Sequence, residues 1–373
     1  MKNRGWMIVL VVASALALCI VADAIFGLKS QPASRRESRP LPSVQIVMAS
    51  SAITENPSAK RVLLLGAHAN EYREVLQRAG LECADDTTDN EVDIVFASGA
   101  RTSKQERSAR QLLKKNGAWA ECVNAREITM ADFRKTLSSM PEKCVHLWMP
   151  GELDWVIVGR SEEAKPSMAE LFDVFSRESA FPDLVAANCD SMPILFASYA
   201  GIREDILPAF RHRNMKQGPR PEYFITRDVP KLDWMVMDDV DADIREGALR
   251  EMRSMQIVRR IILVGVMHAE NGEEDKAVES WAKAALRSPC DTMLVERLDR
   301  LSVNAQAFLK LGKTAMAAMC YDHMAQIKPN DPMPVYNYGL CMRQLGEKEL
   351  AELAFQRADE LTRAAEPPED AEQ

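Results

Sequence analysis

The sequence predicts an α/β domain followed by an all-α domain of repeated helix pairs, with an apolar helix at the N-terminus. Three observations support this prediction. Short apolar runs typical of buried strands alternate with amphipathic helical patterns over residues 60–160. Gly272, Gly312 and Gly346 each separate two amphipathic helical segments. Seventeen apolar or small residues run from Trp6 to Ala22.

Composition and charge indicate a globular chain of two or three domains and argue against two classes of site. The 373 residues are 47% hydrophobic and 27% charged, as in ordinary folded proteins. The net charge is −8 and no dense run of Lys and Arg occurs, so we expect no nucleic-acid partner. The eight cysteines lack metal-ligand spacing, so we expect no metal site and interpret them as buried thiols.

The N-terminal segment, residues 1–28, is predicted to be a transmembrane anchor or a signal sequence. Its apolar run is near the lower length limit for a spanning helix. Ala22-Asp23-Ala24 resembles a cleavage site, so the chain is either a single-pass membrane protein, which we favour, or a secreted or periplasmic protein. Basic residues flank both ends of the run, so the side of the membrane stays open. Residues 29–60, rich in Ser, Pro and Arg, are predicted to be a linker with a candidate strand at Val44–Ala49.

A three-layer α/β domain of the Rossmann-like type is predicted over residues 60–235. Helix starts are indicated by a capping box of Ser103 and Glu106 and by Thr129 with Asp132. The alternation of strands and helices implies a parallel sheet with antiparallel additions at its edge. Buried strands are expected at 61–65, 92–97, 118–123, 145–148 and 155–159.

The order of these elements resembles a known family. From Val92 to Gly159 the chain carries the strand VDIVFA, the helix end LLKKNG, the strand AWAECV, the segment EITMADFRKTL and the pair HLWMPGELDWVIVG. This order is similar to the later half of a spermidine-synthase-like domain, which has the AdoMet-methyltransferase fold. The segment Thr226–Trp234 is similar to the closing segment of that family. The resemblance implies a nucleotide site after the first strand, where Gly66 and His68 lie, with Asp85 among the acids near the ribose.

Departures from the family pattern indicate a pseudoenzyme. The turn after the first strand, residues 66–70, holds one glycine where the family has several. Where the aminopropyltransferases carry a catalytic aspartate, this chain has Ser98-Gly99-Ala100-Arg101. No carboxylate stands there to deprotonate an amine, so we expect no catalytic residue and no cofactor. His68 could bind phosphate or act as a base, but we favour a polar loop residue that caps a helix.

The C-terminal region, residues 258–363, shows a repeat. Gly312 and Gly346 are 34 residues apart, while Gly272 and Gly312 are 40 apart, which requires a six-residue insertion. Small side chains let two helices cross closely, and an aromatic fills the gap to the next pair. The matched positions are the small residues Gly265, Ala305 and Gly339, the alanines Ala277, Ala317 and Ala351, the aromatics Trp281, Tyr321 and Phe355, and the prolines Pro289 and Pro329. This pattern resembles three tetratricopeptide repeats. A connecting helix is predicted over 236–257 and a disordered acidic tail over 364–373.

These features predict a membrane-tethered, non-enzymatic adaptor. The tetratricopeptide resemblance implies a concave face that binds a protein partner, with His268, Asn304, Asn337 and Arg343 as candidate contacts. Docking of the array on its own α/β domain and homo-oligomer formation are the alternatives to an outside partner. The alternative function is a spermidine-synthase-like transferase that uses AdoMet or decarboxylated AdoMet in an altered site. A regulatory subunit beside an active paralogue is a third hypothesis.

Overall fold

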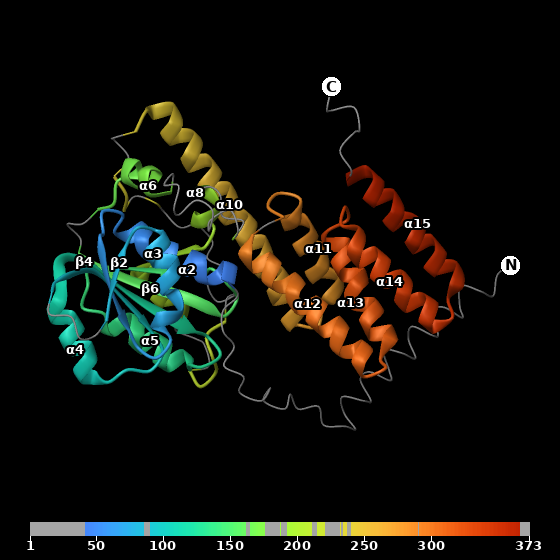
Figure 1. Ribbon diagram of the computed structural model, residues 1–373, viewed down its shortest axis with the longest axis horizontal. Helices are drawn as coiled ribbons and strands as arrows, with labels where there is room; N and C mark the ends of the chain where they lie inside the picture. Colours follow the sequence, from blue (N-terminus) through green and yellow to red (C-terminus); the bar gives the residue numbers. More distant parts are fainter. Residues whose placement is uncertain are drawn as a thin grey trace. The chain divides into compact units, whose positions relative to one another are not determined.

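Seven strands of the described residues form one mixed sheet in the order β2-β1-β3-β4-β6-β5-β7 (Figure 1). The structure is a computed structural model that describes residues 42–85, 90–161, 165–175, 187, 192–210, 215–220, 232, 234–236, 240–289 and 291–365, all within one unit, Leu41–Gln373. The strands are β1 (Arg61–Leu65), β2 (Glu82–Ala84), β3 (Val92–Ser98), β4 (Leu113–Asn124), β5 (Cys144–Trp148), β6 (Asp154–Arg160) and β7 (Tyr199–Ile202).

The first four strands are parallel, and the rest extend the sheet beyond β4. β1 pairs in parallel with β2 and β3, and β3 pairs in parallel with β4. β6 lies antiparallel between β4 and β5, and β7 is antiparallel to β5. The carboxyl ends of β1, β3, β4 and β5 therefore lie at one edge of the sheet, together with the start of β6. The prediction of a parallel sheet with antiparallel additions is confirmed.

Helices cover both faces of the sheet, because residues that alternate along each strand pack into two separate cores (Figure 1). One face is covered by α2 (Pro42–Glu55), α3 (Arg73–Arg78), α6 (Met168–Phe175) and α8 (Met192–Phe196). The other face is covered by α4 (Ser103–Leu112), α5 (Met130–Ser139) and α9 (Arg203–Ile206). The short 3-10 helices η1 (Ala69–Tyr72) and η2 (Leu207–Phe210) complete the elements of this domain.

The second half of the predicted linker is a buried helix, which corrects the expectation of a strand at Val44–Ala49. Residues 44–55 of α2 are buried on nearly every side, including Ser51 and Thr54, which bond to backbone carbonyls one turn earlier. A short run that is buried all round has no hydrophobic period that separates a strand from a helix. The arginines of the preceding residues do not extend into this segment, whereas serine is about as frequent in it as before.

Glu55 at the end of α2 fixes this helix to the sheet. Its fully buried carboxylate accepts hydrogen bonds from His146 Nδ1 at 2.7 Å, Trp148 Nε1 at 3.0 Å and Arg160 Nε at 3.0 Å. Burial alone would raise the pKa of Glu55, but His146 and Arg160 outweigh it and lower the pKa below its ordinary 4.5. The carboxylate is therefore held ionised inside the core.

Two sequence predictions, the capping box of α4 and the role of Gly117, are wrong in detail. The capping box of α4 is formed by Thr102 and Gln105, one residue before the predicted pair. Gly117 does not end a helix but lies inside β4, where an added Cβ would be 2.9 Å from Asp93 O. The cap of α5 is confirmed, since the Thr129 side chain accepts from the Asp132 amide.

Six helices follow the sheet and pack as three pairs (Figure 1). Gly272, Gly312 and Gly346 lie between the two helices of each pair with φ of +74°, +69° and +87°, a conformation that favours glycine. The helices are α10 (Ala242–Glu270), α11 (Glu274–Ala285), α12 (Thr292–Lys310), α13 (Thr314–Ile327), α14 (Pro332–Leu345) and α15 (Lys348–Ala365). An all-α C-terminal region of paired helices is therefore confirmed.

The matched small and aromatic residues meet inside the pairs. A Cβ atom added to Gly265 would lie 2.4 Å from Trp281 Nε1, and one added to Gly339 would lie 2.8 Å from the Phe355 ring. Trp281 Nε1 also donates to Ile262 O at 3.2 Å. The small residues thus permit the first and third pairs to cross closely, as their spacing predicts.

The six-residue insertion lengthens α12 and the loop before it. α12 has 19 residues, whereas α14 has 14. α10 runs without a break through residues 257 and 258, where the connecting helix was expected to give way to the array. The first pair and the start of α12 share the core on one face of the sheet, and the later helices form a separate small core.

Several predictions concern residues outside the described ranges. They include the N-terminal anchor or signal over 1–28, most of the segment 226–234 and the tail from 366 onward. Among the helices that the structure describes, none is both long and apolar enough to cross a membrane.

Candidate functional site

The carboxyl edge of the sheet at β1 and β3 is where an open α/β sheet would bind a ligand. After β1 the chain passes to β2 on one side, and it then crosses to β3 on the other side. Such a reversal opens a crevice at the carboxyl ends of the two central strands. Gly66 follows β1 and Gly99 follows β3, so the sequence-predicted nucleotide site falls at this point.

The amide groups of the turn after β1 are hydrogen-bonded to the turn after β3. Ala67 N donates to Ala100 O at 3.1 Å, and His68 N donates to Ser98 O at 3.0 Å. Gly66 has φ +101°, and a Cβ atom there would lie 2.4 Å from Ser98 O. Backbone amides of this turn are the groups that hold phosphate in nucleotide-binding sheets. Two of these amides, those of Ala67 and His68, are already hydrogen-bonded to the turn after β3. Gly66 has no side chain, which allows the two turns to approach each other closely.

His68 lies across the turn after β3. A Cβ atom on Gly99, which has φ +80°, would be 2.5 Å from His68 Cδ2. His68 Nδ1 is 3.3 Å from Glu71 Oε1. The expected capping bond is missing, because the His68 side chain precedes η1 without accepting or donating a cap hydrogen bond. The imidazole therefore packs against the turn after β3.

Asp85 follows β2 but is paired with an arginine. Its carboxylate bonds to Arg73 Nη2, and the same guanidinium donates to Asn70 Oδ1 at 2.9 Å and Cys83 O at 3.3 Å. Since Asp85 is exposed on one side and ion-paired on the other, its oxygens already have a partner within the chain. A ribose would have to compete with Arg73 for them.

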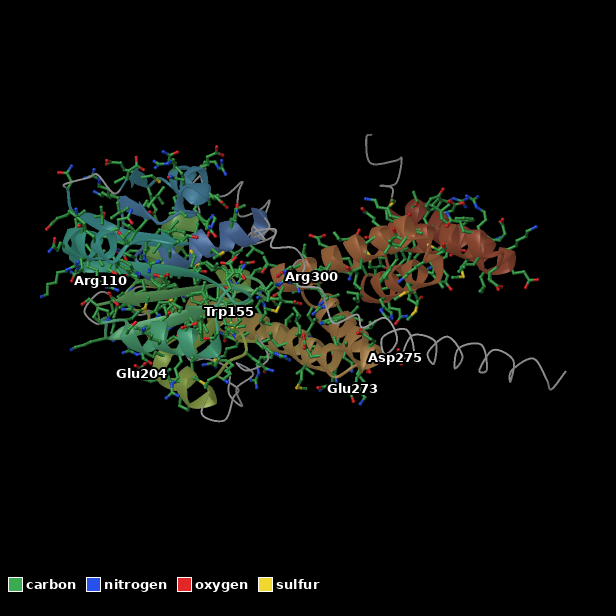
Figure 2. All side chains as sticks on the ribbon, turned by 90° about the horizontal axis from the view of Figure 1, so that it is seen from below. Arg110, Trp155, Glu204, Glu273, Asp275 and Arg300 are labelled. Carbon is green, nitrogen blue, oxygen red and sulfur yellow. The ribbon has the colours of Figure 1, made fainter. Side chains whose placement is uncertain are left out.

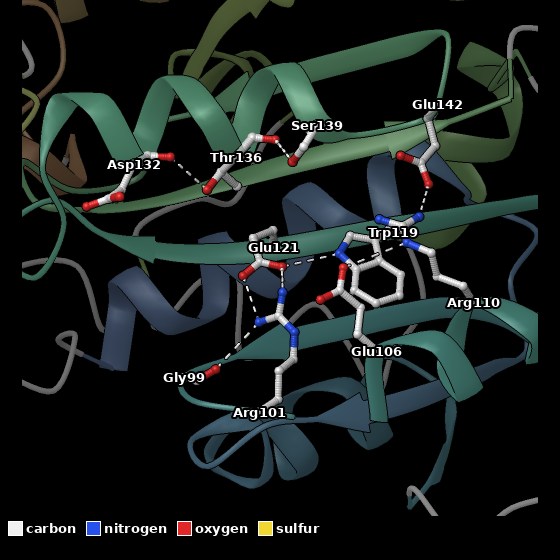
Figure 3. A network of polar contacts seen from close by, with 10 residues as sticks. All are labelled: Gly99, Arg101, Glu106, Arg110, Trp119, Glu121, Asp132, Thr136, Ser139 and Glu142. Atoms are coloured by element: carbon white, nitrogen blue, oxygen red, sulfur yellow. Dashed lines mark hydrogen bonds and ion pairs between the residues drawn. The ribbon is translucent and has the colours of Figure 1, made fainter. Parts of the chain in front are cut away.

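Arg101 follows β3 by three residues, and it forms an ion pair with the carboxylate of Glu121 (Figure 3). Arg101 donates from Nη1 and Nη2 to the two carboxylate oxygens of Glu121 in β4. Glu121 also accepts a hydrogen bond from Trp119 Nε1 at 3.2 Å. Arg110 packs 4.1 Å above the Trp119 ring and pairs with Glu142. Burial raises the pKa of Glu121 although Arg101 opposes that rise. The carboxylates of Glu121 and Glu142 and the guanidinium groups of Arg101 and Arg110 are therefore ion-paired within the chain.

The sequence did not indicate a buried polar cluster that lies at the end of β3 and the start of β6. Tyr72, Ser98, Cys122 and Asp154 interact there, and Asn124 Nδ2 donates to Asp154 Oδ1 at 3.0 Å. Burial raises the pKa of Tyr72 and Cys122 above their ordinary values, so both stay protonated. Burial and the charge of Glu296 raise the pKa of Asp154 to about 7. Asp154 is the one member of this cluster for which the structure indicates proton exchange near neutral pH.

The helical pairs hold the sheet edge at the loop between β5 and β6, residues 149–153. Arg259 of α10 donates from Nη1 to Met149 O at 2.6 Å and to Pro150 O at 3.4 Å. Arg259 Nε bonds to Asp291 Oδ2 at 3.0 Å, and Asp291 caps α12. Thr292, at the start of α12, also donates to Pro150 O. The first helices of the first two pairs thus bond to the α/β domain at this loop, while the choice between this docking and an outside partner stays a prediction.

The N-terminal half of α12 continues this contact with charged groups. Glu152 N donates to Glu296 Oε2 at 2.8 Å. The Glu152 side chain pairs with Arg297 at 2.8 Å and with Arg300, which also bonds to Glu296. Arg300 is marked in Figure 2. No sequence motif indicates the pairs of Glu152, because Arg297 and Arg300 are more than a hundred residues away from it.

The four candidate partner-binding residues lie apart from one another. His268 pairs with Glu273 at the end of α10, and Asn304 is exposed on α12. Asn337 is half-buried on α14, while the exposed Arg343 packs 5.4 Å from the Phe355 ring. Each is described, and no contact among them is present. Arg343 alone has neighbours that suggest a recognition surface.

A surface patch around Arg343 was missed by sequence reasoning. Met333 and Tyr336 of α14 are 60% and 44% exposed. Tyr336 contacts the Phe355 ring with centroids 5.3 Å apart, so Tyr336 and Arg343 flank the same aromatic. Spacings of three and seven residues place Met333, Tyr336 and Arg343 along one side of α14. We call these three residues with Phe355 the α14 patch.

Metal ligands and comparisons with known proteins add no further site. Within the described ranges, no group of three or more His, Cys, Asp and Glu side chains is placed to hold a metal ion. No protein-family model and no curated protein matches the chain.

Proposed function

We propose that this chain is a membrane-tethered adaptor whose helical pairs bind a protein partner, with a spermidine-synthase-like domain that serves as a platform rather than as an enzyme. The platform role of the α/β domain is supported by the turn after β1, whose amides are hydrogen-bonded within the chain. Its amides at Ala67 and His68 donate to the turn after β3, and the His68 ring packs against Gly99 of that turn. A nucleotide phosphate would find these donors already used.

The charges near the crevice support the same proposal. Arg101 replaces a catalytic carboxylate and holds Glu121 in a bidentate pair. A general base must be free to accept a proton from substrate, and a carboxylate bound by a guanidinium on both oxygens is a poor acceptor. The loop 149–153, at the same edge of the sheet, is held by α10 and α12.

The α14 patch is the surface that we propose for the partner. Exposed aromatic, Met and Arg side chains are enriched at protein interfaces and carry most of the binding energy. Tyr336 and Arg343 are held by contact with Phe355, so little conformational entropy is lost when a partner covers them. The membrane tether in this proposal rests on the sequence of residues 1–28 alone.

Site-specific photo-crosslinking in intact cells tests the partner surface. A benzophenone amino acid replaces Tyr336 in the full chain, and the control carries it at the exposed Asp359 of α15. The proposal expects one crosslinked protein from position 336 and none from position 359. An equal pattern from both positions, or no adduct at 336, counts against the α14 patch.

The second candidate function is a transferase with an altered site. The observation that favours it is Asp154, whose pKa of about 7 suits proton transfer and which lies near Ser98 at the carboxyl edge. Calorimetry with AdoMet and with decarboxylated AdoMet on the detergent-solubilised full chain separates the two. Saturable binding at micromolar concentration supports the transferase, and absence of heat up to millimolar concentration supports the adaptor.

A further inference from the structure

Three carboxylates from two distant segments meet where α12 contacts the sheet edge. Glu152 and Asp154 come from the loop and start of β6, and Glu296 comes from the N-terminal half of α12. Their exposed fractions are 3%, 7% and 8%. Arg297 and Arg300 pair with Glu152, and Arg300 also pairs with Glu296. Asp154 accepts a hydrogen bond from a neutral group, Asn124 Nδ2, at 3.0 Å.

The surroundings of Asp154 make its ionisation costly while α12 is in contact. Its carboxylate is buried, and the charge that most disfavours its ionisation is that of Glu296. Burial and Glu296 raise its pKa from 3.8 to about 7 against the opposing charge of Arg126 and Arg300. The titratable and charged groups that face Asp154 are Glu296 and Arg300 from α12, Arg126 and Glu127 after β4, Cys122 within β4, and Tyr72 of η1.

We propose that the contact between α12 and the loop 149–154 is a proton-sensitive latch, tight at mildly acidic pH and loosened above neutral pH. Protonation of Asp154 removes its repulsion from Glu296 and leaves the Asn124 bond in place. Release of α12 would take Glu296 away and admit water, so the pKa of Asp154 would fall back toward 3.8. The proposal concerns this junction and does not depend on a partner at the α14 patch.

The direction of the pH dependence follows from the difference in the pKa of Asp154 between the closed latch and the released one. A carboxyl group whose pKa is higher in the closed state binds more protons there, so acid favours closure. The stabilisation is complete below about 3.8 and is lost as the pH rises through about 7. Burial also raises the pKa of Glu152, which acts in the same direction. Between pH 6 and pH 8 the latch is therefore expected to weaken.

Hydrogen exchange at the latch measures this directly in the full chain. The Glu152 amide donates to Glu296 Oε2, so its protection reports closure. After division by the intrinsic exchange rate at each pH, protection of a peptide over 149–154 should fall roughly tenfold from pH 6 to pH 8, the equivalent of one pKa unit. A peptide over β3, which has no bond to α12, should keep its protection.

Two variants separate the latch from general loss of structure. Asp154→Asn removes the titrating group and should make protection at 149–154 independent of pH. Glu296→Gln keeps an oxygen acceptor for the Glu152 amide but removes the repelling charge, so it should reduce the pH dependence. Asp359→Asn, on the exposed side of α15, should behave as wild type. Equal pH dependence in wild type and Asp154→Asn, or stronger protection at pH 8 than at pH 6, overturns the proposal.

Discussion

Arg259 of α10 donates a 2.6 Å hydrogen bond to the carbonyl oxygen of Met149, the residue that follows β5. The Met149 amide in turn donates to Ser198 O before β7, so this backbone unit is used on both sides. The same guanidinium holds Asp291, the cap of α12. One buried side chain thus joins the first helix pair, the second helix pair and the edge of the sheet.

Replacement of Arg259 by Met should destabilise the protein strongly. The change leaves Asp291 without its buried cation and Met149 O without a donor, which costs about 3 kcal/mol of unfolding free energy. Urea unfolding followed by circular dichroism measures the effect. Arg253→Met is the matched control, because Arg253 is exposed on the same helix and should change stability by less than about 0.5 kcal/mol. Similar midpoints for the two variants would contradict the central place of Arg259.

Alanine at two glycines of α10 should have opposite effects. Gly265→Ala places a Cβ atom 2.4 Å from Trp281 Nε1, so the first helix pair must separate and stability should fall by about 1–3 kcal/mol. Gly247→Ala meets nothing within 4 Å and should raise stability by about 0.5–1 kcal/mol through helix propensity. Thermal unfolding of both variants decides the matter. A tolerated Gly265→Ala would mean that the pair does not cross as closely as described.

Glu55→Gln should remove a stabilising charge that depends on pH. The variant leaves Arg160 and His146 beside a neutral group in the core, at a cost of about 3 kcal/mol at pH 7. Because the pKa of Glu55 is lowered below 4.5 in the folded state, its contribution is present above that value and is lost as the pH falls through the folded pKa. Unfolding free energies of wild type and variant should therefore converge in acid. A difference that stays constant from pH 7 to pH 3 would show that the charge is unimportant.

Gly66→Ala tests whether Gly66 is required for the contact between two turns of the fold. The added Cβ would lie 2.4 Å from Ser98 O at a φ of +101°, so we expect a loss of more than about 2 kcal/mol. Gly272→Ala is the control, since its φ is +74° but nothing lies within 4 Å; left-handed strain alone should cost it about 1 kcal/mol. Chemical unfolding compares the two. Equal losses would mean that the contact between the two turns adds nothing.

The repeat pattern was predictable because its residue types are dictated by local geometry. Gly265 and Gly339 must be small where an aromatic of the partner helix crosses, and spacing alone reveals that requirement. α2 was not predictable in the same way. Its residues are buried on all sides, so neither a period of two nor one of 3.6 marks it. Glu55 gave no signal either, because its partners are about ninety to a hundred residues away.

The candidate site likewise has features that the sequence could predict and features that depend on long-range contacts. The single glycine at 66 and the missing carboxylate near Arg101 pointed from sequence alone toward a site without catalysis. The sequence could not indicate that the amides of Ala67 and His68 are occupied, because that depends on the approach of two turns. The pairs of Glu152 with Arg297 and Arg300 likewise arise only from the docking of α12. Long-range contacts of this kind leave no periodic trace.

Affinity capture from detergent-solubilised native membranes tests the central claim most directly. The full chain is compared with the double variant Tyr336→Ala/Arg343→Ala and with Arg357→Ala, an exposed arginine of α15 outside the α14 patch. The account predicts one protein in near-stoichiometric amount with wild type and Arg357→Ala, and its loss of at least tenfold with the double variant. Equal recovery from all three chains would contradict the claim that the α14 patch holds a partner.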